Sequence, residues 1–403
     1  MGAWMADHER VDDWPNGTAA VTLTDWAIAA LLVAVMTSGL DVFFGLRKLA
    51  RAAALRPWEG PNTPAVSLVV PARNEARNIE RAMRSLLAQQ WPALEIVAVD
   101  DRSDDGTAAI LDRLSAQDPR LTVVHVAELP NGWLGKNHAL HLGAARARGT
   151  WILFADADVL MHPELISRIV RYATEQGFDH VALGPEMRMP GFVLEAFSTG
   201  FVLSFHGFMR PWKARDPTSA HFIGIGAFNL VRAESYRRAG GHEPIRLRPD
   251  DDIKLGKILK RSGARQDLVD GTGMATVEWY HSLRELVRGL EKNAFAGLEY
   301  RVMFAVPAVL LHLAMGLGPL VGLVLLRGLP QVLCAVMVAW AFFLYGHVAG
   351  RIGTRRSTAL LYPLFVVMFN WIVLRTMVVN LRDGGIRWRG TFYPLAELRK
   401  NRV

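Results

Sequence analysis

Residues 95–107 read EIVAVDDRSDDGT, and this stretch indicates the fold class more clearly than any other part of the chain. Its first five residues are mostly apolar, as in a buried strand, and the strand ends at Asp100 and Asp101. The polar residues up to Thr107 then have the composition of a turn that leads into a helix. Strand, acidic turn and helix in this order are typical of an α/β domain.

The same alternation continues on both sides of this stretch. Further strands are predicted at residues 66–70, 121–126 and 150–154, and helices at 78–89, 107–116 and 137–148. This pattern predicts a mostly parallel, doubly wound α/β sheet, in which ligands bind beyond the carboxyl ends of the strands. No Gly-x-Gly-x-x-Gly follows the first strand, so a dinucleotide site is disfavoured.

Carboxylates gather at three places in this domain. Asp100 and Asp101 end one strand, Asp156-Ala-Asp158 follows another, and residues 250–252 are all Asp. One of residues 103–105 is expected to cap the next helix, a purely structural role. The Asp156–Asp158 pair suits Mg²⁺ or Mn²⁺ bridging to a diphosphate, and a carboxylate on a third segment can take a proton from an attacking hydroxyl.

The positive charge of the chain lies in its last quarter. The 403 residues have a formal net charge of +8, and residues 301–403 alone contribute twelve basic against two acidic side chains. Basic residues that flank apolar stretches are typical of membrane anchoring, so nucleic acid is not an expected partner. The single cysteine, Cys334, excludes an internal disulfide.

Four apolar stretches have the length of a bilayer-spanning helix. They are residues 26–46, 302–326, 328–350 and 357–379. The first is followed by Arg47, Lys48 and Arg51, so residue 47 onward is expected in the cytoplasm. The loop 351–356 and the tail after residue 381 are both basic as well, so one C-terminal stretch is expected to be re-entrant or interfacial, and 357–379 is the best candidate.

These observations divide the chain into predicted segments. They are an extracytoplasmic tail (1–25), a transmembrane helix (26–46), a basic linker (47–64), a cytoplasmic catalytic domain (65–300), a membrane region of two or three spans (301–380) and a basic tail (381–403). The apolar stretch 192–209 is either an interfacial amphipathic helix or a helix packed on the sheet. The expected location is therefore the cell (inner) membrane, crossed several times.

The chain resembles membrane-bound family 2 glycosyltransferases of the GT-A fold. The matching motifs are VVPARNEARNIERAMRSLLAQ (69–89), VDDRSDDGT (99–107), DAD (156–158), GIGAFNLVR (224–232), GG (240–241) and DDDIKLG (250–256). Three more stretches resemble the branch that contains hopanoid-associated, carotenoid and ceramide-type lipid glycosyltransferases. These are LPNGWLGKNHAL (129–140), YHSLRELVRGLEKNAFAG (280–297) and RWRGTFYP (387–394).

The resemblance implies roles for residues at matching positions. Nucleotide-sugar binding falls to Pro71, Arg73, Glu75, Asp100, Asp101, Lys136 and Asp156. Asp158, with Asp156, would bind the metal ion. Asp252 would be the catalytic base, with Asp251 in the place of the Glu that precedes it in the family. Gly224 and Gly226 would allow close backbone approach beneath the acceptor, or only a turn.

One family feature is missing. Many processive relatives carry Gln/Arg-x-x-Arg-Trp after the third carboxylate, and this chain does not. Arg284, Arg288 and Lys292 have helical spacing in that region, so they either offer positive charge to the departing diphosphate or form a solvated face paired with Glu285 and Glu291.

The expected activity is therefore an inverting, metal-dependent transfer of a hexose from a UDP-sugar to a hydroxyl of a membrane lipid. A processive polysaccharide synthase is the alternative within the family, and a catalytically inactive membrane scaffold is the alternative outside it. The sugar and the lipid are left open.

Overall fold

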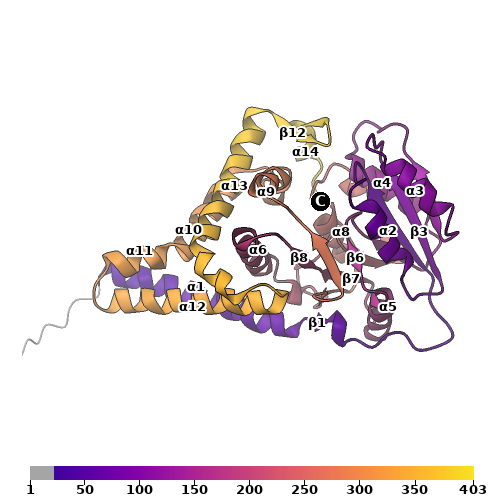
Figure 1. Ribbon diagram of the computed structural model, residues 1–403. Helices are drawn as coiled ribbons and strands as arrows, with labels where there is room; N and C mark the ends of the chain where they lie inside the picture. The colour runs from indigo at the N-terminus through magenta and orange to yellow at the C-terminus, as the bar shows by residue number, and fades with distance from the viewer. Residues whose placement is uncertain (1–21) are drawn as a thin grey trace, which may run out of the picture.

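A computed structural model describes residues 22–403 of the chain. Its central layer is an eight-stranded sheet in the order β1-β10-β7-β9-β5-β2-β3-β4 (Figure 1). The strands are β1 (Ala50–Arg51), β2 (Val66–Ala72), β3 (Leu94–Asp100), β4 (Leu121–His125), β5 (Trp151–Phe154), β7 (His180–Gly184), β9 (Asn229–Arg232) and β10 (Gln266–Asp270). All neighbours pair in parallel except β9, which is antiparallel to both of its neighbours. The predicted mostly parallel α/β fold is confirmed.

Helices cover both faces of the sheet because β2 and its neighbours are buried on both sides. Leu68 packs in the cluster that contains Met83 of α2 (Ile79–Leu87), whereas Val69 packs with Leu140 of α4 (Gly135–Arg146) on the opposite face. A strand buried on both faces carries a continuous apolar run, which is why residues 66–70 were readable as a strand. Helices α3, α5, α7 and α8 complete these layers at Thr107–Ser115, Leu165–Gln176, Ala233–Arg238 and Asp251–Arg261.

Two smaller sheets flank this core. A three-stranded sheet contains β6 (Leu160–Met161), β11 (Ala275–Glu278) and β8 (Glu186–Arg188) in that order. Near the C-terminus, β12 (Gly385–Trp388) and β13 (Thr391–Pro394) form an antiparallel hairpin, followed by α14 (Leu395–Lys400).

Several long apolar helices lie to one side of the sheet. They are α1 (Leu23–Lys48), α6 (Phe192–Met209), α10 (Val302–Gly316), α11 (Gly318–Leu325), α12 (Leu329–Ile352) and α13 (Tyr362–Arg382). Within residues 22–403, four segments are long and apolar enough to cross a bilayer, and α10 with α11 would add a fifth as a pair bent by 46°. The break therefore falls between Gly316 and Gly318, whereas the stretch 357–379 contains the continuous helix α13. Most of the predicted tail 1–25 lies outside the described residues.

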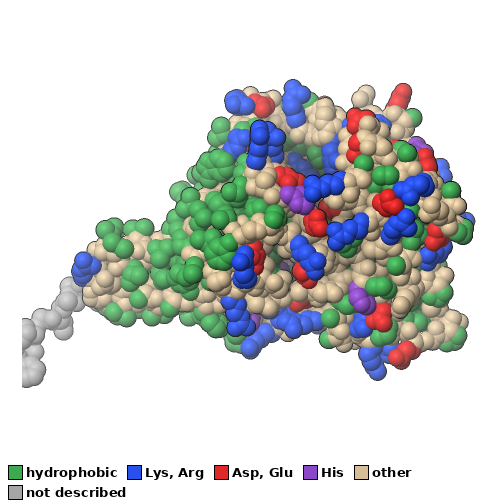
Figure 2. Space-filling view, in the orientation of Figure 1, with side chains coloured by type: hydrophobic (Ala, Val, Ile, Leu, Met, Phe, Trp, Pro, Cys, Tyr) green, Lys and Arg blue, Asp and Glu red, His purple; other side chains and the backbone are tan. Residues whose placement is uncertain are grey.

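The apolar helices run in two directions. Helices α1 and α12 extend side by side away from the sheet, whereas α13 rises from beside α12 at a steep angle to both (Figure 1). Two ion pairs fasten the chain just before α13: Arg351 at the end of α12 contacts Asp270 of β10 at 3.2 Å, and Arg355 contacts Glu195 of α6 at 2.6 Å. Figure 2 shows the exposed hydrophobic side chains concentrated over this helical part and charged side chains over the rest.

Helix α6 lies between the sheet and the other apolar helices. Val202 and Leu203 pack against the cluster that contains Ala182 of β7 and Leu268 of β10. At Gly200 of the same helix, an added Cβ atom would lie 2.3 Å from the ring of Phe365 in α13. One side of α6 therefore packs on the sheet, as one of the two sequence interpretations proposed, while the other contacts α12 and α13.

Candidate active site

The predicted nucleotide and metal residues meet at one edge of the sheet. Parallel pairing places Ala72 of β2 opposite Asp100 of β3, and Val69 of β2 opposite Phe154 of β5. The carboxyl ends of the three strands therefore lie together. Because Pro71 and Arg73, Asp100 and Asp101, and the 156–158 segment are attached to these ends, the fold brings them to the same edge.

The adjacent charges of Asp100 and Asp101 are both balanced by partners. Asp101, which is 3% exposed, accepts a hydrogen bond from Arg102 at 2.8 Å and contacts Arg73 at 3.5 Å. Asp100 lies 3.2 Å from the Nδ1 atom of His125. These partners explain how two neighbouring carboxylates are accommodated in a buried position.

The turn that follows β2 is fixed to the acidic loop 103–107. The backbone N–H groups of Asn74 and Glu75 donate to the hydroxyls of Ser103 and Thr107, at 3.0 and 2.8 Å. The Glu75 carboxylate takes no part in these bonds and accepts a hydrogen bond from Arg389 at 2.6 Å. Arg73 and Glu75 thus extend from a turn that these hydrogen bonds hold in place.

Lys136, near the start of α4, joins two of the three carboxylate groups. Its Nζ atom lies 2.8 Å from Asp156 and 3.4 Å from Asp251. Burial disfavours the charged form of Lys136, but the charges of Asp156, Asp251 and Asp252 outweigh it and raise the pKa of the ammonium group. Lys136 therefore stays protonated among these acids.

The third carboxylate group has three members with different surroundings. Asp250 is held by the buried guanidinium of Arg248 through two contacts of 2.9 Å, which indicates a structural role. Asp251 is 4% exposed, and burial together with Asp252 and Asp156 raises its pKa to about 7 although Lys136 opposes the shift. Asp252 is more accessible, and burial raises its pKa as well.

Gly226 links the second and third carboxylate groups through its own peptide groups. Its N–H donates to Asp252 at 2.7 Å, and its carbonyl accepts from the N–H of Asp156 at 3.1 Å. A Cβ atom at Gly226 would lie 2.7 Å from Asp156, and one at Gly224 would lie 1.8 Å from the carbonyl of Asp252. Both glycines are therefore required by close approach to the site.

The acidic residues at 156–158 fit a cation that is shared with a substrate. Within the described chain, no group of three His, Cys, Asp or Glu side chains could hold a metal ion. Asp156 and Asp158 offer two carboxylates, and Mg²⁺ commonly binds one or two carboxylates together with water and substrate phosphates. Burial and the charges of Asp156 and Glu75 raise the pKa of Asp158 to about 7, an effect that a nearby cation would reverse.

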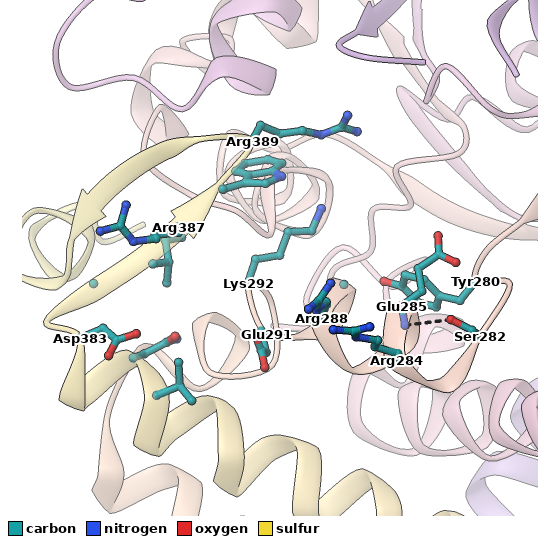
Figure 3. A pocket seen from close by; sticks show the side chains of 16 residues that line it. Tyr280, Ser282, Arg284, Glu285, Arg288, Glu291, Lys292, Asp383, Arg387 and Arg389 are labelled. Carbon is teal, nitrogen blue, oxygen red and sulfur yellow. Dashed lines mark hydrogen bonds between the residues drawn. The ribbon is translucent and has the colours of Figure 1, made fainter. Parts of the chain in front are cut away.

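The basic residues predicted after the third carboxylate line a cavity. Arg284 and Arg288 lie on α9 (Leu283–Leu290) and Lys292 just beyond its end, and all three border a cavity of about 640 Å³ (Figure 3). They do not form the expected ion pairs, because Glu291 contacts Arg375 at 2.7 Å and Glu285 accepts from the backbone N–H of His281. The ion pairs of that alternative are therefore not formed, whereas Arg284 and Arg288 are exposed to solvent as it expected.

Lys292 connects this cavity with the carboxylates. Burial and the charge of Lys136 lower the pKa of Lys292 to about 8, although Asp156 and Asp251 oppose the shift. Its ammonium group also lies 4.5 Å from the ring centre of Trp388 in β12. Lys292 thus lies between the acidic site and the C-terminal hairpin.

Sequence reasoning missed the part that the hairpin takes in the site. Arg389, at the turn between β12 and β13, donates to the carbonyl of Arg73 and to the carboxylate of Glu75. The motif at 387–394 indicates a resemblance to a family branch, but it does not by itself indicate a contact with the site. Its two arginines around a tryptophan were the available signal, but no local pattern relates them to a turn 316 positions away.

Comparison with known proteins shows a family likeness over the part of the chain that carries β2 to β9 and most of the site edge. Residues 67–238 match the family model "Glycosyl transferase family 2". The 4,4'-diaponeurosporenoate glycosyltransferase of Staphylococcus aureus is 24% identical over 345 residues, which cover 83% of this chain and 90% of that protein.

A solved structure has a similar fold. The mannosyltransferase PcManGT from Pyrobaculum calidifontis, determined in complex with GDP-Man and Mn²⁺, is 20% identical and aligns with a TM-score of 0.53. The alignment covers 90% of this chain and 99% of that one. The likeness at this identity concerns the fold, and it agrees with the GT-A type expected from the motifs.

Proposed function

We propose that this chain, which carries a family 2 glycosyltransferase domain over residues 67–238, transfers a hexose from a nucleotide-sugar to a membrane lipid. The observation that carries the proposal is the gathering of Asp156, Asp251 and Asp252 around Lys136 at the carboxyl edge of the sheet. The relative from S. aureus, named for a lipid-like carotenoid acceptor, and the apolar helices beside the site support a lipid as the acceptor.

The nucleotide part of the donor is assigned to the turn after β2 and the end of β3. Pro71, Arg73 and Glu75 border this edge, and Asp100 or Asp101 would accept hydrogen bonds from the base or the ribose. A UDP-hexose is the simplest donor. Lys136 would contact the sugar-diphosphate, since it lies among Asp156, Asp251 and Asp252.

Transfer with inversion requires an attacking oxygen, a base and stabilisation of the leaving group. Asp252 would accept the proton of the acceptor hydroxyl as its oxygen bonds to the anomeric carbon, and the nucleoside diphosphate would leave with the electrons of the broken bond. Asp251 would keep Lys136 in place. A Mg²⁺ or Mn²⁺ ion bound by Asp158 and Asp156 would offset negative charge on the diphosphate.

Membrane attachment would place the site at the lipid surface. The basic residues after α1 favour a cytoplasmic catalytic domain, spanning about residues 65–300, in a multi-pass protein of the inner membrane. Helix α13 runs at a steep angle to α1 and α12 (Figure 1), so we place it in the interface rather than across the bilayer. The basic segments before and after α13 then lie on the same side.

Nucleotide binding by the purified full-length protein tests the donor assignment. We expect Mn²⁺ to raise the affinity of the wild type for UDP, and the Asp158→Ala variant to lose this increase, because its metal carboxylate is gone. The exposed Glu234→Gln variant is the control, since that carboxylate lies away from the site at the start of α7. An equal effect of Mn²⁺ on Asp158→Ala would contradict the metal assignment.

The length of the product separates this function from that of a processive synthase. A single hexose on each lipid is expected here, whereas a processive synthase would form a ladder of products.

A further inference from the structure

The cavity beside α9 has a composition that the donor site does not explain. It lies between α9, the end of α13 and the hairpin β12–β13, and we call it the α9 cavity (Figure 3). Its charged lining residues are Arg284, Arg288, Lys292, Arg387, Arg389, Glu285, Glu291 and Asp383. Basic side chains therefore outnumber acidic ones.

The acidic side chains of the α9 cavity already have partners. Glu291 contacts Arg375 at 2.7 Å, Asp383 accepts from Arg382 at 2.8 Å, and Glu285 accepts the N–H of His281 at 2.9 Å. The charges of Glu291 and Asp383 are therefore balanced by arginines outside the lining, whereas Glu285 keeps its charge at the exposed rim.

Most of the cations have no such partner. Among residues 22–403, no carboxylate lies within 4.0 Å of the charged atoms of Arg284, Arg288, Lys292 or Arg387. Arg389 alone of the five is paired, with Glu75. A cavity that collects unpaired cations favours a bound anion, because each charge-assisted hydrogen bond is stronger than a neutral one.

A buried donor without a partner points to the same conclusion. Asn380 of α13 lines the α9 cavity and is 3% exposed, yet its side-chain Nδ2 atom has no hydrogen-bond partner. An unsatisfied buried N–H group costs free energy, which a bound acceptor oxygen would recover.

The position of the α9 cavity indicates which kind of molecule brings the anion. Its wall includes Val379 and Asn380 at the end of the apolar helix α13. On the faces of that helix turned away from the cavity, Trp371, Val378 and Leu381 expose between 40% and 57% of their surface. An anion bound in the cavity therefore lies on the other side of a helix that presents apolar side chains outward, as is expected of a lipid headgroup at a membrane surface.

We propose that the α9 cavity binds an acidic headgroup, carboxylate or phosphate, of the lipid acceptor, an inference that rests on the function proposed above. Lys292 lies where the cavity approaches the carboxylates, so a lipid whose acidic group is held by Arg284 and Arg288 extends its hydroxyl toward Asp252. The acceptor is then an acidic lipid rather than a neutral sterol-like or diacylglycerol-like alcohol.

Equilibrium binding of amphiphiles to the full-length protein in nanodiscs of neutral lipid tests this proposal. The probes are a long-chain fatty acid, a long-chain alkyl phosphate and the fatty alcohol of the same length. We expect at least one of the acidic probes to bind about tenfold or more tightly than the alcohol. The Arg284→Gln/Arg288→Gln variant should lose this preference, and Arg387→Gln, a separate test from the opposite wall, should reduce it. Arg327→Gln, an exposed arginine between α11 and α12, should retain it.

Three outcomes would overturn the proposal. The first is equal binding of the acids and the alcohol. The second is equal binding of butyrate, a short-chain acid, and the long-chain acid, which would assign the α9 cavity to a free anion. The third is displacement of the fatty acid by UDP, which would assign the cavity to the donor. Because binding is measured without turnover, failure here is distinguishable from failure of the proposed function, which is absence of sugar transfer with any lipid.

Discussion

At the scale of single residues, the site depends on short-range balancing of buried charge. Lys136 contacts Asp156 and Asp251, and the peptide group of Gly226 joins Asp156 to Asp252. Lys136 and Gly226 therefore hold these carboxylates close together. This arrangement leaves Asp252, which is the more accessible of the two catalytic candidates, next to a fixed positive charge.

Two buried histidines near this site should make stability depend on pH. Burial lowers the pKa of His180 to about 4 and of His242 to about 3. His180 lies 3.1 Å from Asn229, and His242 lies 2.7 Å from the hydroxyl of Tyr236. Both therefore favour the neutral form in the folded chain.

The sign of the effect follows from proton binding. As pH falls below about 6.5, the unfolded chain protonates these histidines before the folded chain does, so the folded state loses stability. The stability they contribute is complete above pH 6.5 and declines as the pH falls toward 4. Thermal unfolding between pH 7.5 and 4.5 should show this fall, and it should be shallower in His180→Gln/His242→Gln. The exposed His162→Gln serves as control, and an equal slope in both variants would contradict the explanation.

At the scale of elements, the hairpin β12–β13 closes the nucleotide end of the site. Arg389 donates to the carbonyl of Arg73 and to Glu75, so the hairpin holds the turn after β2. We expect Arg389→Gln to raise the KM for the nucleotide-sugar several-fold, because charge-assisted hydrogen bonds of this kind contribute about 1.5–3 kcal/mol before solvent screening reduces them.

The melting temperature of Arg389→Gln should fall by no more than a few degrees, since the turn of the hairpin is exposed and solvent screens these hydrogen bonds. Arg402→Gln, from the same basic tail, is the matched control. Steady-state kinetics over a range of donor concentrations separates KM from kcat. An unchanged KM, or an equal change in Arg402→Gln, would exclude a role for the hairpin in donor binding.

The elements differ in how far the sequence could predict them. Strands β2, β3 and β5 were readable because their apolar runs are buried on both faces and end at acidic or proline-containing turns. Strand β10 was not, because its sequence QDLVD includes Asp267. That carboxylate is 1% exposed and is accommodated by Tyr172 and Arg215, both at 2.6 Å, partners that only the folded chain brings together.

The candidate site shows the same division. The motifs indicated Lys136, Asp156 and Asp252 because each lies in a compact local pattern. Arg389 and Asn380 lacked such a pattern, since their contacts or their cavity are created by α13 and the hairpin, far along the chain from the sheet. The break between α10 and α11 was also missed, although Gly316, Gly318 and Pro319 are the sequence signal for it.

At the scale of the whole molecule, the charges and apolar helices define an expected orientation. Helices α1, α11 and α12 extend away from the sheet, and the basic residues that end α1 lie beside it (Figure 1). We expect the loop between α11 and α12 on the opposite side of the membrane from the catalytic domain.

Labelling of single cysteines tests this orientation. In a Cys334→Ser background, a membrane-impermeant maleimide should label Arg327→Cys in intact cells and label Gln117→Cys only after lysis. Both positions are exposed in the structure, so accessibility to the reagent should depend on the membrane alone. The reverse pattern would place the catalytic domain outside the cell.

The central claim, transfer of a hexose to a lipid by this group of carboxylates, has one direct measurement. Lipids are extracted after purified protein in nanodiscs has been incubated with a labelled UDP-hexose and the lipid extract of its host, and their masses are compared. The wild type and Glu234→Gln should yield a lipid heavier by a single hexose, whereas Asp252→Asn should form it about 10²–10⁴-fold more slowly while still binding UDP. A hexose-bearing lipid formed equally fast by Asp252→Asn, or none formed by the wild type with any nucleotide-hexose, would contradict the account.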